Sequence, residues 1–482
     1  MKPEMKLIFE KSREGRTGYQ VPDTGVESVD PRAHLGRWFR EDIAGFPELS
    51  EPEVVRHFVN LSKLNYSIDE GMYPLGSCTM KYNPKINETT AAMDGFAGVH
   101  PYWPERQIQG ALRLMRDLEH LLCEITGLAA FSLQPAAGAH GELTGMLMVT
   151  AHNKSRGEKR DVVLIPDSAH GTNPSSAHIC GLKVQQIASN TRGRLDLESL
   201  RAHISPSVAA LMITNPNTLG LFEDEIAKIA GMLHEAGAQL YMDGANMNAL
   251  LGKVRPGDLG VDVLHLNLHK TFSTPHGGGG PGAGPVGAAK HLERFRPVPV
   301  IEEHDGQLRF ASNRPDSVGK VKGFYGNFGM LVRAYTYILS LGASGLREIA
   351  EAAVLNANYV RAKLSDRYHL PYSCLNMHEV ILSDKKQMVH GVTTLNIAKR
   401  LMDYGFHPPT IYFPLIVSGA MMIEPTESEP LDEIDRFIAA MRAIADEAET
   451  NPDIVKNAPH STTVQKLDEA RAARTPILRW KP

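Results

Sequence analysis

One lysine in this sequence lies where an amine could take part in covalent chemistry. Apolar residues at positions 263, 264, 266 and 268 predict a short buried strand, and Lys270 follows its end. The glycine-rich run at residues 277–284 comes soon after. A lysine in a glycine-rich pocket can serve as a nucleophilic amine, whereas a lysine at the edge of a solvated loop has no such role. Other residues must decide between these two interpretations.

The elements that would position this lysine alternate between short strands and helices. Such alternation predicts a mostly parallel sheet, in which ligands gather at the carboxyl ends of the strands. His170, Asn215 and Asp243 each follow an earlier expected strand, so a ring, an amide, a carboxylate and an amine should share one edge. Taken singly, Asn215 and Asp243 could begin turns, and His170 could be a core histidine. The strands are expected at residues 162–166, 183–187, 209–214, 239–242 and 262–268.

A run of small residues precedes an expected helix at residues 143–152. Within it, Ala137, Gly138 and Ala139 leave backbone N–H groups accessible near the start of the helix, where anions bind. The run lacks the Gly-Lys-Ser/Thr ending of a nucleotide triphosphate loop. It therefore favours a site for a single phosphate group, with a simple packing turn as the alternative.

A loop dense in turn residues is expected at residues 71–84. Its side chains Ser77, Cys78 and Thr79 could line a pocket as hydrogen-bond donors, although a plain surface loop would have the same composition.

Two patterns imitate other kinds of site. Residues 282–287 match the G-x-G-x-x-G pattern, but they contain a proline and do not open a βαβ unit, so no dinucleotide site is expected. His265, His269 and His276 resemble a metal-binding cluster, but no neighbouring Asp, Glu or Cys completes a convincing set. No metal site is therefore expected.

The composition is that of an ordinary globular protein of more than one domain. The 482 residues are 42% hydrophobic and 22% charged, and the net charge of −4 gives no reason to expect nucleic acid or an anionic membrane as partner. The four cysteines contain no C-x-x-C pair, which favours a reducing, cytoplasmic compartment. The first residues lack the apolar core of a signal peptide, and no run reaches transmembrane length.

Changes of pattern along the chain predict four parts. We expect an N-terminal arm and active-site loop at residues 1–85, a large cofactor-binding domain at 86–320, a smaller α+β domain at 321–458 and a tail at 459–482. Helices are expected at residues 51–64, 104–126, 321–341, 345–364, 393–404 and 431–448, and a further strand at 411–417.

The candidate residues together describe a pyridoxal phosphate site. In such a site Lys270 forms the Schiff base, Asp243 keeps the pyridine nitrogen protonated, His170 stacks on the ring, and the small-residue run binds the phosphate.

The sequence also resembles the glycine decarboxylase (P-protein) family of the glycine cleavage system, specifically the second subunit of its split bacterial form. The resemblance implies a fold type I pyridoxal phosphate enzyme, with a mostly parallel seven-stranded sheet, helices on both faces and a smaller α+β C-terminal domain. The matching stretches are residues 73–83, 134–145, 167–174, 214–220, 243–246, 265–282, 324–335 and 422–429.

The resemblance also implies a role for each candidate. Lys270, Asp243 and His170 would be catalytic and, with His269, would contact the cofactor. No arginine for the substrate carboxylate is obvious from the sequence, and Arg314 and Arg333 are candidates only. The remaining cofactor candidates are Ala137, Gly138 and Ala139 at the phosphate and Asn215 at the phenolic oxygen, and the substrate candidates are Ser77, Cys78 and Thr79.

The activity that the resemblance implies is decarboxylation of glycine. The aminomethyl group would pass to the lipoyl arm of a separate H-protein with release of CO2, and a homologous subunit 1 would complete an assembly with two copies of each subunit. The alternatives are another fold type I decarboxylase or aminotransferase acting on amino acids, or a non-catalytic subunit. Retention of Lys270 and Asp243 argues against the last.

Overall fold

The computed structural model describes residues 6–276 and 282–479. The chain divides into two compact units, one of residues 1–67 with 461–482 and one of residues 68–460. The glycines expected at residues 277–280, close to Lys270, lie outside the described residues. Among the helices described, none combines the length and the apolar character needed to span a bilayer.

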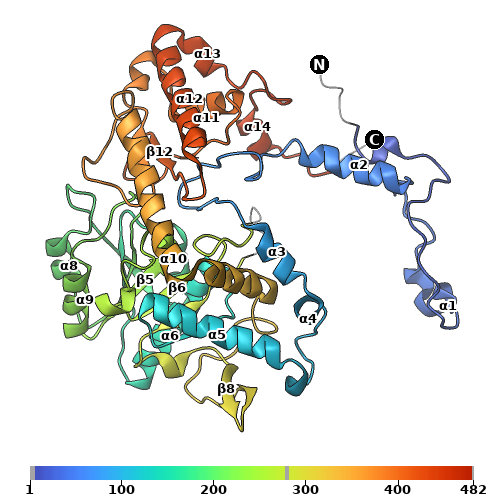
Figure 1. Ribbon diagram of the computed structural model, residues 1–482, viewed down its shortest axis with the longest axis horizontal. Coiled ribbons are helices and arrows are strands. Elements are labelled where there is room, and N and C mark those ends of the chain that lie inside the picture. The colour runs from blue at the N-terminus through green and yellow to red at the C-terminus, as the bar shows by residue number, and fades with distance from the viewer. Residues whose placement is uncertain (1–5, 277–281, 480–482) are drawn as a thin grey trace. The chain divides into compact units, whose positions relative to one another are not determined.

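A seven-stranded sheet forms the centre of the second unit (Figure 1), with the strand order β1-β7-β6-β5-β4-β2-β3. The neighbours β6, β5, β4, β2 and β3 are parallel, whereas β7 is antiparallel to both β6 and β1. The expected mostly parallel seven-stranded sheet is thus confirmed. Its strands are β1 (Ala130–Ser132), β2 (Val162–Pro166), β3 (Lys183–Ile187), β4 (Val208–Thr214), β5 (Gln239–Gly244), β6 (Val263–Leu266) and β7 (Val286–Ala288).

Helices cover both faces of this sheet because its central strands are apolar on both sides. In β4, Leu211 and Ile213 face a core shared with α5, α8, α9 and the first half of α10, and Ala210 and Met212 face a core shared with α6 and α7. These helices are α5 (Gln109–Thr126), α6 (Gly138–Ser155), α7 (Thr172–Ile179), α8 (Leu197–His203), α9 (Ile226–Glu235) and α10 (Phe328–Leu364).

A smaller core lies at the C-terminal end of the same unit. Its antiparallel sheet has the order β10-β12-β11, and α11, α12 and α13 pack with it (Figure 1). The strand expected at residues 411–417 is wrong beyond Ile411, because Tyr412 has a φ of 57° and Phe413 precedes a proline. The elements are β10 (Val380–Ser383), β11 (Thr410–Ile411), β12 (Ala420–Ile423), α11 (Thr394–Asp403), α12 (Leu431–Thr450) and α13 (Pro452–Lys456).

Two helical segments that meet at a kink, together labelled α10, join the two cores. The two helices expected at residues 321–341 and 345–364 are confirmed as the two halves of α10, which is interrupted at Gly342, where φ is 61° and ψ is −172°. The first half begins only at Phe328. The residues of α10 up to Ala350 belong to the larger core, and Val360 and Leu364 belong to the smaller one. The boundary expected at residue 321 therefore precedes a helix that both cores share.

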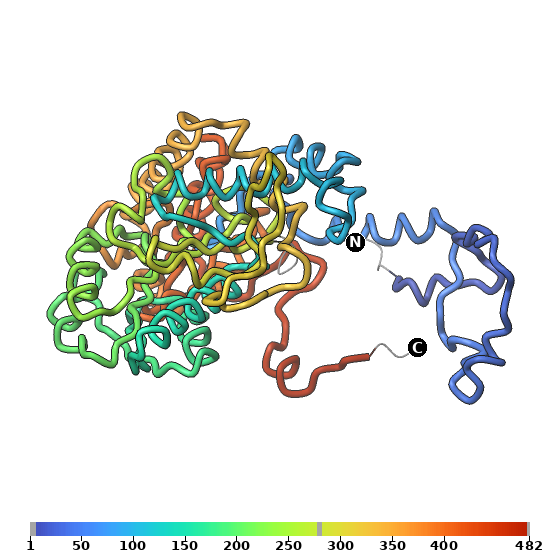
Figure 2. The backbone as a smooth tube through the Cα atoms, turned by 90° about the horizontal axis from the view of Figure 1, so that it is seen from below, coloured from blue at the N-terminus to red at the C-terminus, as the bar shows by residue number. Residues whose placement is uncertain are grey.

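The remaining elements are smaller. The second unit also contains α3 (Lys85–Ala91), α4 (Asp94–Ala97) and a hairpin of β8 (Val300–His304) and β9 (Gln307–Ala311). Of these, α3, α4 and β8 pack against the larger core through Ala91, Phe96 and Ile301. The first unit contains α1 (Pro31–Leu35), α2 (Glu51–Ser62) and α14 (Glu469–Arg474). Figure 2 shows its N-terminal segment as long loops that connect short helices. Of its described residues, only Leu49 and His57 are buried.

Candidate active site

The strand ends place the expected carboxylate and amine at one edge of the sheet. Asp243 lies in β5, opposite Thr214 of β4 and His265 of β6, and Lys270 follows β6 by four residues. The Asp243 side chain is buried, and its Oδ1 accepts a hydrogen bond of 2.9 Å from the N–H of Ala245. Asp243 therefore starts a turn, as one sequence interpretation held, and also presents a buried carboxylate at this edge.

A histidine and a tyrosine fix the orientation of this carboxylate. His265 Nε2 lies 3.3 Å from Asp243 Oδ1, and its Nδ1 lies 2.7 Å from the Tyr241 hydroxyl. Burial lowers the pKa of His265, against the opposing effect of Asp243, so the ring is neutral at neutral pH. With the proton assigned to Nε2, the ring donates to Asp243 and accepts from Tyr241.

A second buried carboxyl group belongs to the same cluster. Glu142 of α6 accepts hydrogen bonds from Thr172 Oγ1 at 2.8 Å and Ser176 Oγ at 3.3 Å. Burial and the charge of Asp243 raise the pKa of Glu142 to about 8, so that it is protonated at neutral pH. Its oxygen lies within 4.8 Å of the ligand atoms of Asp243 and His265. The expectation that no neighbouring Asp or Glu accompanies His265 is therefore wrong. Asp243 of β5 and Glu142 of α6 reach His265 from other elements of the fold.

The loop with small polar side chains lies at Lys270. Lys270 Nζ donates to the Ser77 carbonyl at 2.7 Å, and Thr79 is buried, so the surface-loop interpretation is wrong. Ser77 and Thr79 have φ values of 62° and 48°, a left-handed conformation that costs a non-glycine residue on the order of 1–3 kcal/mol. Contacts with Glu379 and Glu424 hold the loop in this conformation: Ser77 N–H donates to Glu379 at 2.8 Å, and Thr79 donates to Glu424 from N–H at 2.9 Å and from Oγ1 at 2.6 Å.

The small-residue run begins helix α6 as expected. Ala137 is its N-cap and provides no side-chain cap, so the N–H groups of the first turn are not bonded to a capping side chain. A Cβ at Gly138 would lie 2.8 Å from the side-chain amide of Asn267 and 3.1 Å from His265 Nε2. Glycine at this position thus lets the start of the helix, with Ala139, approach the end of β6.

The other predicted cofactor contacts lie at or near the same edge. His170 is exposed, makes an edge contact with the Phe413 ring at 5.8 Å, and is acted on by the charges of Asp243 and Lys270. Asn215 is buried, and its Oδ1 accepts a hydrogen bond of 3.1 Å from the N–H of Glu223. This oxygen therefore stabilises the loop between residues 215 and 223.

The histidine next to Lys270 is uncharged. Burial, followed by the positive charge of Lys270, lowers the pKa of His269 to about 3, and its ring lies 5.1 Å from that of His276.

The two arginines proposed for a substrate carboxylate are already paired. Arg333 donates to both oxygens of Glu88 at 2.8 and 2.7 Å, and Arg314 donates to Glu302 at 3.0 Å.

The structure adds a buried lysine that sequence reasoning missed. Lys81 Nζ donates to the Thr271 carbonyl at 2.7 Å, to the Tyr337 hydroxyl at 3.1 Å and to Glu427 at 2.6 Å. Burial disfavours its charge, but Glu427 outweighs this effect and raises the pKa of Lys81 above its usual value. The sequence feature that could have indicated a buried Lys81 is its position in the loop at residues 71–84.

These residues fit pyridoxal phosphate. Three buried oxygens lie at the ends of three neighbouring strands and have no hydrogen-bond partner within the described parts of the chain: Thr214 Oγ1 in the last residue of β4, Asn246 Oδ1 after β5 and Asn267 Oδ1 after β6. Buried polar atoms are nearly always paired, so three at one edge indicate a polar ligand. An amine for the aldehyde, a carboxylate for the pyridine nitrogen and a helix start for the phosphate accompany them.

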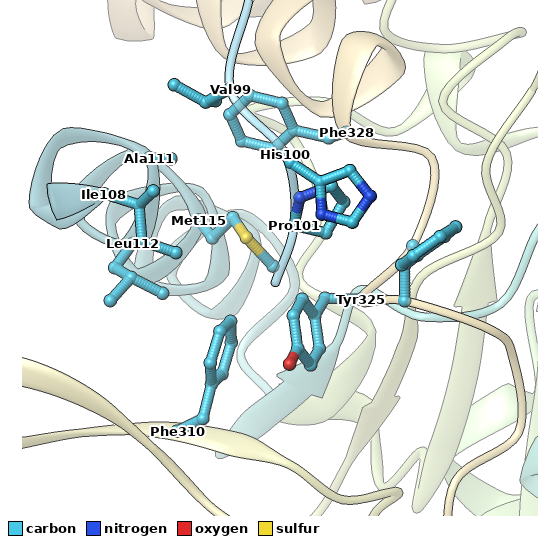
Figure 3. A pocket seen from close by; sticks show the side chains of 12 residues that line it. Val99, His100, Pro101, Ile108, Ala111, Leu112, Met115, Phe310, Tyr325 and Phe328 are labelled. Carbon is cyan, nitrogen blue, oxygen red and sulfur yellow. The ribbon is translucent and has the colours of Figure 1, made fainter. Parts of the chain in front are cut away.

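An apolar pocket lies elsewhere in the same unit, between α5 and the start of α10 (Figure 3). Its described lining contains no amine or carboxylate side chain. The pocket is lined by Val99, His100, Pro101, Ile108, Ala111, Leu112, Met115, Phe310, Phe324, Tyr325, Gly326 and Phe328.

Solved structures with a related fold include pyridoxal phosphate enzymes. An inhibitor-bound glycine decarboxylase (P-protein) of the glycine cleavage system aligns with a TM-score of 0.73 at 20% identity, covering 86% of this chain and 94% of that one. A cysteine desulfurase from Escherichia coli aligns with a TM-score of 0.60 at 14% identity, covering 79% and 95%. At these identities the likeness establishes the fold.

Sequence comparison identifies the family. The family model described as "Aminotransferase class-V" matches residues 143–280, and that described as "Glycine dehydrogenase, C-terminal domain" matches residues 349–466. The "Probable glycine dehydrogenase (decarboxylating) subunit 2" of Alkaliphilus oremlandii is 55% identical, covering 99% of this chain and 98% of its own. The protein of that name from Chlorobium chlorochromatii is 57% identical, covering 97% and 98%. The chain therefore belongs to the glycine dehydrogenase (decarboxylating) subunit 2 family.

Proposed function

We propose that this chain decarboxylates glycine with pyridoxal 5'-phosphate and transfers the remaining aminomethyl group to the lipoyl arm of an H-protein. The observation that carries the proposal is the meeting of Lys270, Asp243 and the uncapped start of α6 at one sheet edge, in a chain of this family. A cytoplasmic location is part of the proposal, supported by four cysteines that are all free thiols.

Each residue of the site has a definite task in this reaction. When bound, pyridoxal phosphate supplies the electron sink that accepts the electron pair left behind as CO2 departs. Lys270 provides the amine that holds the cofactor aldehyde. Asp243, oriented by His265, keeps a proton at the pyridine nitrogen, and His170 covers the ring. The N–H groups from Ala137 to Ala139 bind the phosphate.

The transfer step balances without any further redox partner. The electron pair from the glycine Cα–carboxylate bond forms a new C–S bond to one sulfur of the lipoyl disulfide. The S–S bond breaks, and the second sulfur leaves with its electron pair and takes up one proton. The products are CO2 and an aminomethyl thioether beside a free thiol, so the protein must supply a proton and exclude water.

Exchange of labelled bicarbonate into glycine tests this function. We expect the chain, assembled with a homologous subunit 1 and supplied with lipoylated H-protein, to catalyse the exchange with glycine and not with alanine or glutamate. Omission of the H-protein should remove most of the rate. Equal rates with other amino acids would instead support another decarboxylase or aminotransferase.

We also expect the isolated chain to be poorly active without subunit 1. The first unit exposes large apolar side chains, among them Tyr19 at 76%, Trp38 at 76% and Phe46 at 70%, and such surfaces gain order on a partner. The isolated chain should show about a tenth or less of the rate of an assembly with two copies of each subunit. Molecular mass and exchange rate, measured on the same sample, check this. A homodimer that exchanges at the full rate would overturn it.

A further inference from the structure

Two carboxyl groups of the smaller core meet beside Lys270. Glu379 immediately precedes β10 and Glu424 immediately follows β12, and these strands pair antiparallel with Val380 opposite Ile423. The two glutamates therefore lie at the same end of the ladder. Their exposed fractions are 0% and 1%.

A neutral histidine accompanies the pair. The ligand atoms of His378, Glu379 and Glu424 lie within 4.8 Å of one another. Neither ring nitrogen of the fully buried His378 has a hydrogen-bond partner in the described chain, and Nε2 is 3.7 Å from Glu379. Burial lowers the pKa of His378 to about 3, so this ring does not neutralise the carboxylates.

The other charged and titratable groups that act on the pair lie on three segments, one of which also carries Glu424. Lys270 lies after β6, Cys78 in the loop, and Glu427 after β12, where Lys81 pairs with it. Lys270 is thus the one cation that acts on both glutamates without a carboxylate partner among the described residues.

The pair retains a proton near neutral pH. Burial, and then the charge of Glu424, raises the pKa of Glu379 far above its usual value. Burial raises the pKa of Glu424 to about 7, although Thr79 opposes this shift. Two carboxylates this close together in a dry interior do not both ionise.

Support of the loop alone does not require ionisable groups. The N–H groups of Ser77 and Thr79 need only acceptors, which glutamine amides would provide without the free-energy penalty of a buried charge. The carboxyl chemistry therefore has another use.

We propose that Glu379 and Glu424 share one proton and act as a positioning pair that sets the charge state of the nitrogen at Lys270. While that nitrogen is protonated, the pair carries a single negative charge. A proton that leaves the nitrogen is taken up by the pair, so that the net charge of the site does not change. The inference rests on the proposed function only in that the cofactor binds at Lys270.

A double-mutant cycle with Glu379→Gln and Glu424→Gln tests the shared proton in the cofactor-loaded complex. Each glutamine keeps an acceptor for the loop and removes one ionisable group. In either single variant the remaining glutamate ionises, so we expect the pH midpoint of the cofactor's visible absorbance to move little. The double variant loses the charge, and its midpoint should fall by about 1 unit or more.

Glu429→Gln is the matched control. Burial also raises the pKa of Glu429 to about 7, but Glu433 and Glu427 are the charges that act on it, so its replacement should leave the midpoint unchanged. Two equal, additive shifts in the single variants would mean two independent charges. An unmoved midpoint in the double variant would mean that the pair only supports the loop. Either result overturns the proposal, whichever amino acid the enzyme uses.

Infrared spectroscopy gives a second readout if the double variant does not fold. In difference spectra at pH 7, each single variant should lack one protonated-carboxyl band of the wild-type complex, while the band of the protonated Glu142 cancels. Persistence of that band in both single variants would contradict a shared proton.

Discussion

Replacement of Lys270 by alanine is expected to abolish glycine turnover, with a loss on the order of 10³-fold or more. The variant lacks the amine that holds the cofactor, and no other described lysine is placed to replace it. Lys81, which lies against the neighbouring Thr271, is already held by Glu427 and Tyr337. The measurement is glycine-dependent release of CO2 by the complete assembly.

Borohydride reduction checks the same assignment without turnover. It should fix cofactor to Lys270 in the wild-type chain and leave none attached in Lys270→Ala. Lys253→Ala is a suitable control, because this partly exposed lysine forms a surface ion pair with Glu351 and its replacement should not affect turnover. Wild-type release of CO2 from the Lys270 variant would refute the role of this lysine.

The strand ends that carry the candidate site were predictable because local sequence patterns determine them. Strands β2 and β3 have the bounds expected from their sequence, β4 and β5 differ by one or two residues at one end, and β6 is shorter by one residue at its start and two at its end. An uninterrupted apolar run marks a strand buried on both faces, and in a parallel sheet the residues after such runs meet at one edge. This reasoning brought Asp243 and Lys270 together.

The carboxyl groups around Lys270 could not be predicted in this way. Glu379 bonds to Ser77 across 302 positions of sequence, and Glu424 bonds to Thr79 across 345. No local periodicity records such pairings, and a single glutamate beside a strand reads as a solvated side chain.

Replacement of Asp243 by asparagine should preserve the fold and reduce turnover by about 10²-fold, or on the order of 3 kcal/mol. The asparagine oxygen can still accept the N–H of Ala245 and the proton of His265, so the turn and the strand pairing remain. The neutral amide cannot keep the pyridine nitrogen protonated while negative charge develops on the ring. Turnover at saturating glycine and H-protein, with thermal unfolding as the check on folding, measures the effect.

Glu142→Gln is the control for Asp243→Asn, because it replaces one neutral polar group of the same cluster by another and removes no charge. Glu142 is already protonated at neutral pH, because burial and Asp243 raise its pKa to about 8, so a neutral amide there changes the charge of the site little. We expect its loss of turnover to stay below about tenfold, well short of that for Asp243→Asn. If Asp243→Asn instead retained at least half of the wild-type rate, the partner of the pyridine nitrogen would have to be another residue. Equal losses in both variants would mean that the hydrogen-bond network, and not the charge of Asp243, governs the reaction.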